Sequence, residues 1–138
     1  IEQVEHRLSI KRTPGNVTII DDAFNSNPAG SKMAIDVLSQ FNGTGKRIIV
    51  TPGMIELGSE QYNLNHEFGR HIAGNVDIAI VVGAYNRDAI TEGIREGGFD
   101  EESLIVVESF NEAQKRLAGI LAAGDTVLYE NDLPDTFK

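Results

Sequence analysis

The sequence predicts an α/β protein with a Rossmann-like open sheet, mostly parallel, with flanking helices and an antiparallel hairpin strand at its N-terminus. Short apolar runs alternate with amphipathic helical stretches, which is typical of buried parallel strands joined by helical crossovers. A proline-glycine turn separates the first two strand patterns. The 138 residues suit one domain, without an internal repeat or a linker.

The N-terminal hairpin is predicted from two strand patterns and the turn between them. Residues 4–11 alternate between polar and apolar side chains, and residues 17–20 form a β-branched run. The intervening residues 13–16 read Thr-Pro-Gly-Asn, in which proline presets φ and glycine tolerates a positive φ. We therefore expect the two strands to pair antiparallel.

The first helix is expected to begin at Pro28, with Asn27 as its N-cap, and to end at Asn42-Gly43. Helical spacing places its apolar side chains on one face, which we expect to be buried. These side chains are Met33, Ala34, Val37, Leu38 and Phe41.

Strands and helices alternate through the remainder of the chain. The strands are expected at residues 47–50, 77–82, 104–107 and 126–129. One helix is expected at about residues 59–73, with Leu64, Phe68 and Ile72 on its apolar face, and a second carries Ile90 and Ile94. A third follows Ser109, because Ser109 and Glu112 have the spacing of a capping box.

Composition excludes several classes of function. Twelve basic and 21 acidic residues give a net charge of −9, which repels phosphate backbones and anionic membrane surfaces, so we expect no nucleic-acid partner. Without cysteine, neither a disulfide nor a thiolate metal site is possible. No apolar run approaches the roughly 20 residues of a membrane span. The start at Ile1, without a leader, predicts a domain excised from a longer cytoplasmic protein.

The candidate site is the edge where the parallel strands end, because ligands of open α/β sheets bind there. The predicted strands are followed by Asp21-Asp22, Thr51-Pro52-Gly53, Gly83, Glu108-Ser109 and Glu130-Asn131-Asp132. The densest polar cluster, residues 21–28, fits either a helix-capping turn or a set of donors and acceptors for a ribose or an anion. Arg7 fits either a solvated edge charge or a bidentate phosphate clamp.

Three other patterns are interpreted as structural. Residues 43–46 read Gly-Thr-Gly-Lys, but they connect a helix to a strand, and Arg47 follows where a P-loop needs serine or threonine. No G-x-G-x-x-G follows a strand, so a nicotinamide or flavin site is not expected. His6, His66 and His71 do not form a metal-ligand set, and we expect surface pairs of His66 with Arg70 and of His71 with Glu67.

Two blocks of sequence carry a resemblance to a known family. His6-Arg7-Leu8, the hairpin, and the run Asp21-Asp22-Ala23-Phe24-Asn25-Ser26-Asn27-Pro28 resemble the start of the C-terminal domain of the Mur ligases. Met54-Ile55-Glu56-Leu57-Gly58, with His66 and Gly69 downstream, is similar to the branch that adds D-alanyl-D-alanine to UDP-N-acetylmuramoyl-tripeptide (MurF). The resemblance covers essentially residues 1–138.

The resemblance implies an ATP-dependent ligase of peptidoglycan synthesis. ATP would phosphorylate the carboxylate of a UDP-linked muramoyl peptide, and the incoming amine would attack the acyl phosphate. The resemblance implies that Arg7 is catalytic and contacts the ATP phosphates, and that Asp22, Asn25 and Asn27 contact the nucleotide. Magnesium ligands and the phosphate loop would belong to the central domain, which, like the N-terminal UDP-substrate domain, is absent from this chain, so we expect the chain alone to be inactive.

The chain departs from that branch at two turns. Thr51-Pro52-Gly53-Met54 stands where the branch usually has Leu-Gly-Asp-Met, and Glu130-Asn131-Asp132 stands in place of a basic Lys-Gly-Ser-Arg turn. Thr51, Glu130, Asn131 and Asp132 are therefore the candidate acceptor-binding residues. Two alternatives remain open: the same chemistry on another acceptor, as in folylpolyglutamate, cyanophycin or MurT-like ligases, or a non-catalytic α/β binding module.

Overall fold

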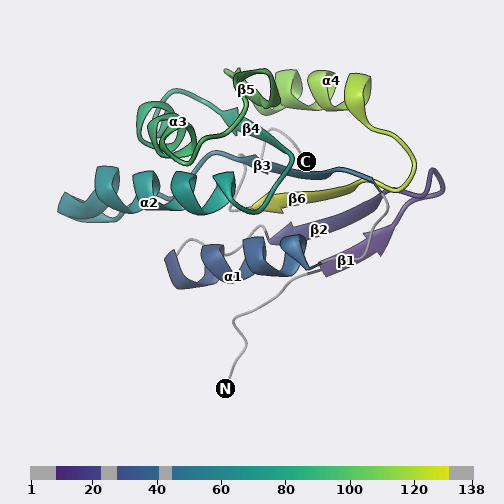
Figure 1. Cartoon of the computed structure of the whole chain (residues 1–138), viewed down its shortest axis with the longest axis horizontal. Helices are drawn as coiled ribbons and strands as arrows, with labels where there is room; N and C mark the ends of the chain where they lie inside the picture. Colours follow the sequence, from purple (N-terminus) through teal and green to yellow (C-terminus); the bar gives the residue numbers. More distant parts are fainter. Residues whose placement is uncertain (1–8, 23–27, 41–44, 131–138) are drawn as a thin grey trace.

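A computed structural model describes residues 9–22, 28–40 and 45–130 (Figure 1). Its strands are β1 (Ser9–Arg12), β2 (Thr18–Asp22), β3 (Arg47–Thr51), β4 (Ile78–Val82), β5 (Leu104–Val107) and β6 (Thr126–Glu130). Its helices are α1 (Pro28–Ser39), α2 (Gln61–Ala73), α3 (Arg87–Glu96) and α4 (Phe110–Ile120), with short 3-10 turns at Gly58–Glu60 and Glu101–Ser103.

The strands form one sheet in the order β1-β2-β6-β3-β4-β5 (Figure 1). β1 is antiparallel to β2, and all the other neighbouring strands pair in parallel. The predicted fold class is therefore confirmed. β6 lies between β2 and β3, so the carboxyl ends of these three strands meet at the same edge.

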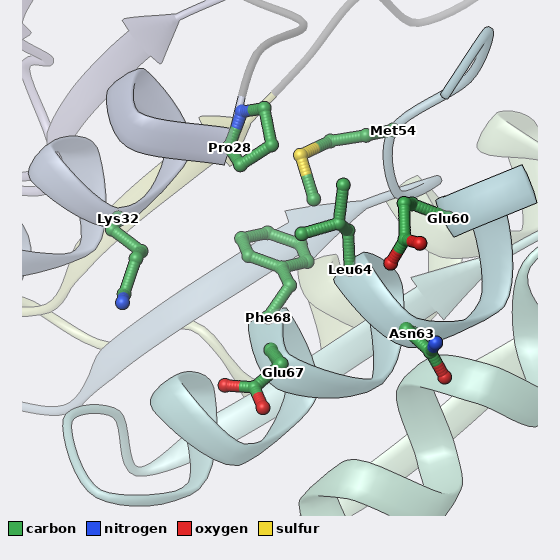
Figure 2. A pocket seen from close by; sticks show the side chains of 8 residues that line it. All are labelled: Pro28, Lys32, Met54, Glu60, Asn63, Leu64, Glu67 and Phe68. Atoms are coloured by element: carbon green, nitrogen blue, oxygen red, sulfur yellow. The ribbon is translucent and has the colours of Figure 1, made fainter. Parts of the chain in front are cut away.

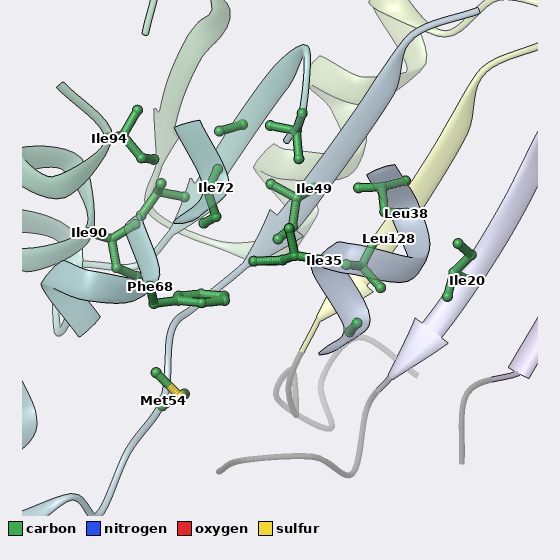
Figure 3. Packing of buried hydrophobic residues seen from close by; sticks show 14 residues of the cluster. Ile20, Ile35, Leu38, Ile49, Met54, Phe68, Ile72, Ile90, Ile94 and Leu128 are labelled. Atoms are coloured by element: carbon green, nitrogen blue, oxygen red, sulfur yellow. The ribbon is translucent and has the colours of Figure 1, made fainter. Parts of the chain in front are cut away.

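Two helical layers cover the sheet. α1, α2 and α3 pack on one face with a core that includes Ile35, Phe68 and Ile90, and Figure 3 shows this cluster. α4 covers the opposite face through Ala113 and Leu117. Successive residues of a strand point to opposite faces, so the central strands are apolar on both sides, as a sheet covered by helices requires.

The structure corrects several details of the predicted elements. β2 continues to Asp22 and β6 to Glu130, so both carboxyl groups belong to strands and not to the turns that follow. In the hairpin turn it is Asn16, not the glycine, that adopts a positive φ of 64°, which asparagine also tolerates.

The buried stripe of α1 also differs from the predicted one. Ala34 and Leu38 are buried as predicted, and Ile35 and Ser31 join them. These four positions follow the i, i+3, i+4, i+7 spacing of one helical face, with Ser31 as its polar end. Met33 and Val37 are only half-buried, and Phe41 lies outside the described residues.

The amino edge of the sheet is fixed by a buried carboxylate. Asp125, just before β6, is 1% exposed and accepts hydrogen bonds from the backbone N–H groups of Lys46 (2.7 Å) and Ala122 (2.9 Å). The Lys46 Nζ lies 2.9 Å from Asp125 Oδ2, the oxygen that also accepts from Ala122. Burial opposes the charge, but these donors prevail and lower the pKa of Asp125. Lys46 therefore serves a helix-to-strand connection, as predicted, on the edge opposite the strands' carboxyl ends.

In the described part of the chain, no helix is both long and apolar enough to cross a membrane.

Candidate functional site

Three polar side chains end three neighbouring strands at the carboxyl edge. Asp22, Thr51 and Glu130 are the last residues of β2, β3 and β6, and Asp22 is directly opposite Glu130 in the parallel register. Each lies two residues beyond a core residue of the α1–α3 face, so strand alternation directs all three toward that helical layer. Those core residues are Ile20, Ile49 and Leu128.

Glu130 connects this edge to α1 and to the turn after β3. Its Oε2 is hydrogen-bonded to the hydroxyl of Ser31, in the first turn of α1, and its Oε1 accepts a hydrogen bond from Thr51 Oγ1 at 3.0 Å. Thr51 Oγ1 in turn accepts the backbone N–H of Gly53 at 2.9 Å. Glu130, Ser31 and Thr51 are all 0% exposed. A single carboxyl group thus links the central strand, a helix and a turn.

The environment of Glu130 favours its neutral form. Burial raises its pKa to about 8, although the hydrogen bonds from Ser31 and Thr51 lower it, and the negative charge of Asp22 raises it further. The group therefore keeps its proton at neutral pH. A neutral carboxyl can donate one hydrogen bond and accept others, so it suits hydroxyl partners on both sides.

The turn after β3 is fixed by a network of buried amides that the sequence interpretation missed. Asn65 Oδ1 accepts the N–H of Met54 at 2.9 Å, and both Asn65 and Asn86 donate to the Met54 carbonyl at 3.0 Å. Gln61 Nε2 donates to Asn86 Oδ1 at 2.8 Å. Asn65 lies three residues before Phe68, on the buried face of α2, and a polar residue on an apolar helical face was the available signal.

A cavity of about 290 Å³ opens at this edge between the N-terminal halves of α1 and α2. Figure 2 shows Met54, Leu64 and Phe68 grouped at its centre, with Lys32 on one side and Glu60 on the other. The cavity thus combines an apolar floor with charges of both signs. The described residues that line it are Pro28, Lys32, Met54, Glu60, Asn63, Leu64, Glu67 and Phe68.

The structure brings together three of the predicted site residues. Asp22, Thr51 and Glu130 meet at the carboxyl edge, where all three are buried. The remaining candidates lie outside the described residues: Arg7, Asn25, Asn27, Asn131 and Asp132. The sequence did not predict the cavity, because its walls come from separate segments that only the folded chain places side by side.

The histidines of α2 pair with neighbouring helices. His66 Nε2 lies 3.0 Å from Glu96 of α3, and His71 Nε2 lies 2.9 Å from Asp36 of α1. The pairs predicted within α2 itself were therefore the wrong ones, because α2 packs between α1 and α3 and their carboxylates come closer. Each histidine holds two helices together.

Comparison with known proteins places the chain in a family. The family model described as "Mur ligase, glutamate ligase domain" matches residues 6–129. The UDP-N-acetylmuramoyl-tripeptide–D-alanyl-D-alanine ligase of Bacillus subtilis (strain 168) is 34% identical over 67 residues, which are 49% of this chain and 15% of that protein.

Solved structures share the fold. The MurF ligase of Thermotoga maritima, in complex with ADP, has a TM-score of 0.75 at 24% identity, over 96% of this chain and 28% of that one. A separately solved domain from a putative UDP-N-acetylmuramate:L-alanyl-γ-D-glutamyl-meso-diaminopimelate ligase of Haemophilus ducreyi has a TM-score of 0.57 at 17% identity, over 91% and 88% of the two chains. The chain therefore spans less than a third of the MurF proteins it matches. Since the family model covers most of the sequence, the chain belongs to the C-terminal, glutamate ligase domain family of the Mur ligases.

Proposed function

We propose that this chain is the C-terminal domain of a cytoplasmic, ATP-dependent, amide-forming ligase that adds D-alanyl-D-alanine to UDP-N-acetylmuramoyl-tripeptide in peptidoglycan synthesis. The observation that carries the proposal is the family match over residues 6–129, together with a curated relative of that activity. The rest of the enzyme, its N-terminal and central domains, would supply the phosphate loop and the binding site of the UDP-linked peptide. The chain alone is then inactive.

The nucleotide would be held at the end of β2. Asp22 accepts hydrogen bonds and carries negative charge, so it fits the hydroxyl groups of a ribose and not a phosphate. Arg7 would face the phosphates, where a guanidinium stabilises the charge of the phosphoryl group in transfer, and Asn25 and Asn27 would contact the nucleotide. ATP supplies the phosphoryl group that activates the peptide carboxylate. The described residues contain no group of three or more His, Asp or Glu side chains placed so that they could hold a metal ion. We assign the magnesium ligands to the central domain.

The incoming amine would bind beside Thr51, Glu130, Asn131 and Asp132. Thr51 and Glu130 are fully buried, so they would act by shaping the edge through their hydrogen bonds. The neighbouring cavity offers an apolar floor for small aliphatic side chains, and Lys32 on its rim offers a cation for a terminal carboxylate.

The experiment that tests the function uses the complete enzyme that contains this chain. Phosphate release from ATP is measured with UDP-N-acetylmuramoyl-tripeptide and, separately, D-alanyl-D-alanine, single amino acids, glutamate and ammonia. Release that depends on D-alanyl-D-alanine alone supports the proposal. Release only with another amine contradicts D-alanyl-D-alanine as the acceptor but still supports ligase activity. No release with any amine contradicts both proposals.

Another acceptor is the second candidate, and one observation favours it. Glu130 begins the acidic segment that stands in place of the basic Lys-Gly-Ser-Arg turn of the D-alanyl-D-alanine branch, and here the side chain is buried against Ser31 and Thr51. A basic turn that could contact an anionic acceptor is thus replaced by an acidic segment, and the carboxyl group of Glu130 lies inside the fold. The amine series in the same assay decides between the two candidates.

A non-catalytic module would use the same edge without turnover. Arg7→Ala in the complete enzyme separates this reading from the ligase: we expect turnover to be abolished while the melting temperature stays within a few degrees. Equal losses of stability and activity would instead remove the catalytic assignment of Arg7. Asp77→Asn, at an exposed ion pair with Arg47 on the other edge, is the matched control and should change neither.

A further inference from the structure

We propose that Glu130 is a positioning residue: its neutral carboxyl group clamps α1 and the turn after β3 to the end of β6, and loss of its proton loosens these two segments, which form one side of the cavity. The inference rests on the proposed function only in naming that cavity as part of the ligand site. The clamp itself stands on the contacts of the chain.

The geometry defines the clamp. Glu130 forms hydrogen bonds with the hydroxyls of Ser31 and Thr51, and the Thr51 hydroxyl accepts a hydrogen bond from the backbone N–H of Gly53. Because all the side-chain partners are fully buried, water does not compete for these bonds. The clamp therefore determines how closely α1 and the turn approach the sheet.

Those two segments carry one side of the cavity. Pro28 and Lys32 belong to α1, and Met54 directly follows Gly53 in the turn. Ser31 is the residue before Lys32, so a displacement of Ser31 moves the cation on the rim. A displacement of Gly53 moves the side chain of Met54 on the floor. The protonation state of Glu130 thus affects the positions of Lys32 and Met54, because these residues directly follow Ser31 and Gly53 in the chain.

The charges around Glu130 make its hydrogen bonds sensitive to the loss of its proton. Asp22, on the adjacent strand about 4.8 Å away, is the titratable group that faces it among the described residues. α1 and β3 contribute only the hydroxyls of Ser31 and Thr51, and Tyr129 points to the α4 side, where its hydroxyl donates to Gln114 at 2.9 Å. An ionised Glu130 would be a second buried acid beside Asp22, and the repulsion between the two charges, together with the cost of burying a charge, favours separation of the segments and entry of water.

The test follows the carboxyl group and the cavity in the chain itself. The described residues build a hydrophobic core on each face of the sheet, and a domain of the same fold was solved separately. The ¹³C resonance of the Glu130 carboxyl, the amide of Gly53 and the methyl of Met54 are recorded by NMR from about pH 5 to pH 10. We expect one shared transition with a midpoint near 8.

Two variants identify the source of that transition. Glu130→Gln keeps the shape and the neutral state: its carbonyl accepts from Thr51, and its amide donates to Ser31 once the Ser31 hydroxyl has turned from donor to acceptor. In this variant the Gly53 and Met54 resonances should show no transition, and their chemical shifts should stay at the wild-type values of neutral pH up to pH 10. Glu102→Gln, at an exposed glutamate near the amino end of β5, is the control and should leave the transition in place.

Three outcomes would overturn the clamp. They are a Glu130 resonance that titrates in the ordinary range of a glutamate, Gly53 and Met54 resonances that ignore pH in the wild type, and a transition that persists in Glu130→Gln. The first two are measured on the wild type, so they remain decisive if the variant fails to fold. In the complete enzyme, KM for the amine should rise several-fold above about pH 8 in the wild type and stay flat in Glu130→Gln. Absence of turnover would count against the proposed function and leave the NMR result intact.

Discussion

The two ends of β6 each bury a carboxyl group, and the two groups behave oppositely. Asp125, at the amino end, is 1% exposed and Glu130, at the carboxyl end, is 0% exposed. Two backbone N–H groups and Lys46 surround Asp125, and its pKa is lowered. Glu130 has two hydroxyl partners and a second acid beside it, and its pKa is raised to about 8. Burial alone therefore does not decide the charge of a group; the donors around it do.

The difference means that the contacts of Asp125 stay the same across the physiological pH range, whereas those of Glu130 depend on its protonation. The Asp125 carboxylate remains charged throughout the physiological range, so the amino edge keeps one arrangement. The Glu130 carboxyl has its transition close to neutral pH, on the edge where ligands of open α/β sheets bind. Three substitutions test this contrast.

The largest effect is expected from Gly53→Ala, which strains the carboxyl edge directly. Gly53 has a φ of 85°, and an added Cβ would lie 2.7 Å from Asn86 Nδ2 and from the Ile90 side chain. We expect a loss of about 3 kcal/mol or more in the free energy of unfolding, measured by urea denaturation. Gly83→Ala is the matched control: it has the same φ of 85°, with nothing within 4 Å of the added atom. It should cost only about 1 kcal/mol, and equal losses would contradict the close packing of the turn.

Asp125→Asn weakens the amino edge. The amide group turns one acceptor into a donor that faces Lys46 or the N–H of Ala122, so we expect a loss of about 2–3 kcal/mol at neutral pH by urea denaturation. The lowered pKa means that the Asp125 carboxylate stabilises the fold above the ordinary aspartate range and stops doing so as pH falls through the folded-state value. The gap between wild type and variant should therefore close in acid. A gap that is constant with pH would show that the charge of Asp125 is not the cause.

The smallest effect is expected from Thr51→Val, which removes one hydroxyl from the Glu130 clamp. Gly53 then lacks its acceptor, and we expect a loss of about 1–2 kcal/mol by urea denaturation. Because the Thr51 bond lowers the pKa of Glu130, its removal should move the transition of the Glu130 resonance to higher pH. Thr91→Val, which removes a buried hydroxyl bonded only within α3, is the control. A transition that moves downward, or moves equally in both variants, would contradict the contact.

The fold could be predicted from the sequence because the spacing of apolar residues shows directly which positions are buried. Alternating apolar strands and helices required a covered parallel sheet, and the capping pattern at Ser109 is seen in the bond from the Glu112 N–H to the Ser109 hydroxyl at 3.1 Å. The carboxyl edge was predicted as well, since Asp22 and Glu130 directly extend apolar strands. Their inward direction was also encoded, in the two-residue step from Ile20 and Leu128.

The protonation state of Glu130 could not be predicted from the residues close to it in the sequence. It depends on Ser31, 99 residues away in the chain, and on Thr51, 79 residues away, and no spacing rule connects such distant positions. The same holds for the amides of Asn65 and Asn86, which meet across two helices around the carbonyl of Met54. Local patterns predict which residues are buried, whereas the partners that set their chemistry follow from the tertiary fold.

The position of β6 has a consequence for how the domain is made. The strand formed from the last described residues occupies the middle of the sheet, between β2 and β3. Until residues 126–130 leave the ribosome, β2 and β3 each have an inner edge without its partner, and the helical layers have an incomplete surface to cover. The sheet can therefore be completed only after β6 has been synthesised, and a truncation before Thr126 divides the sheet at its centre and does not merely remove an edge strand.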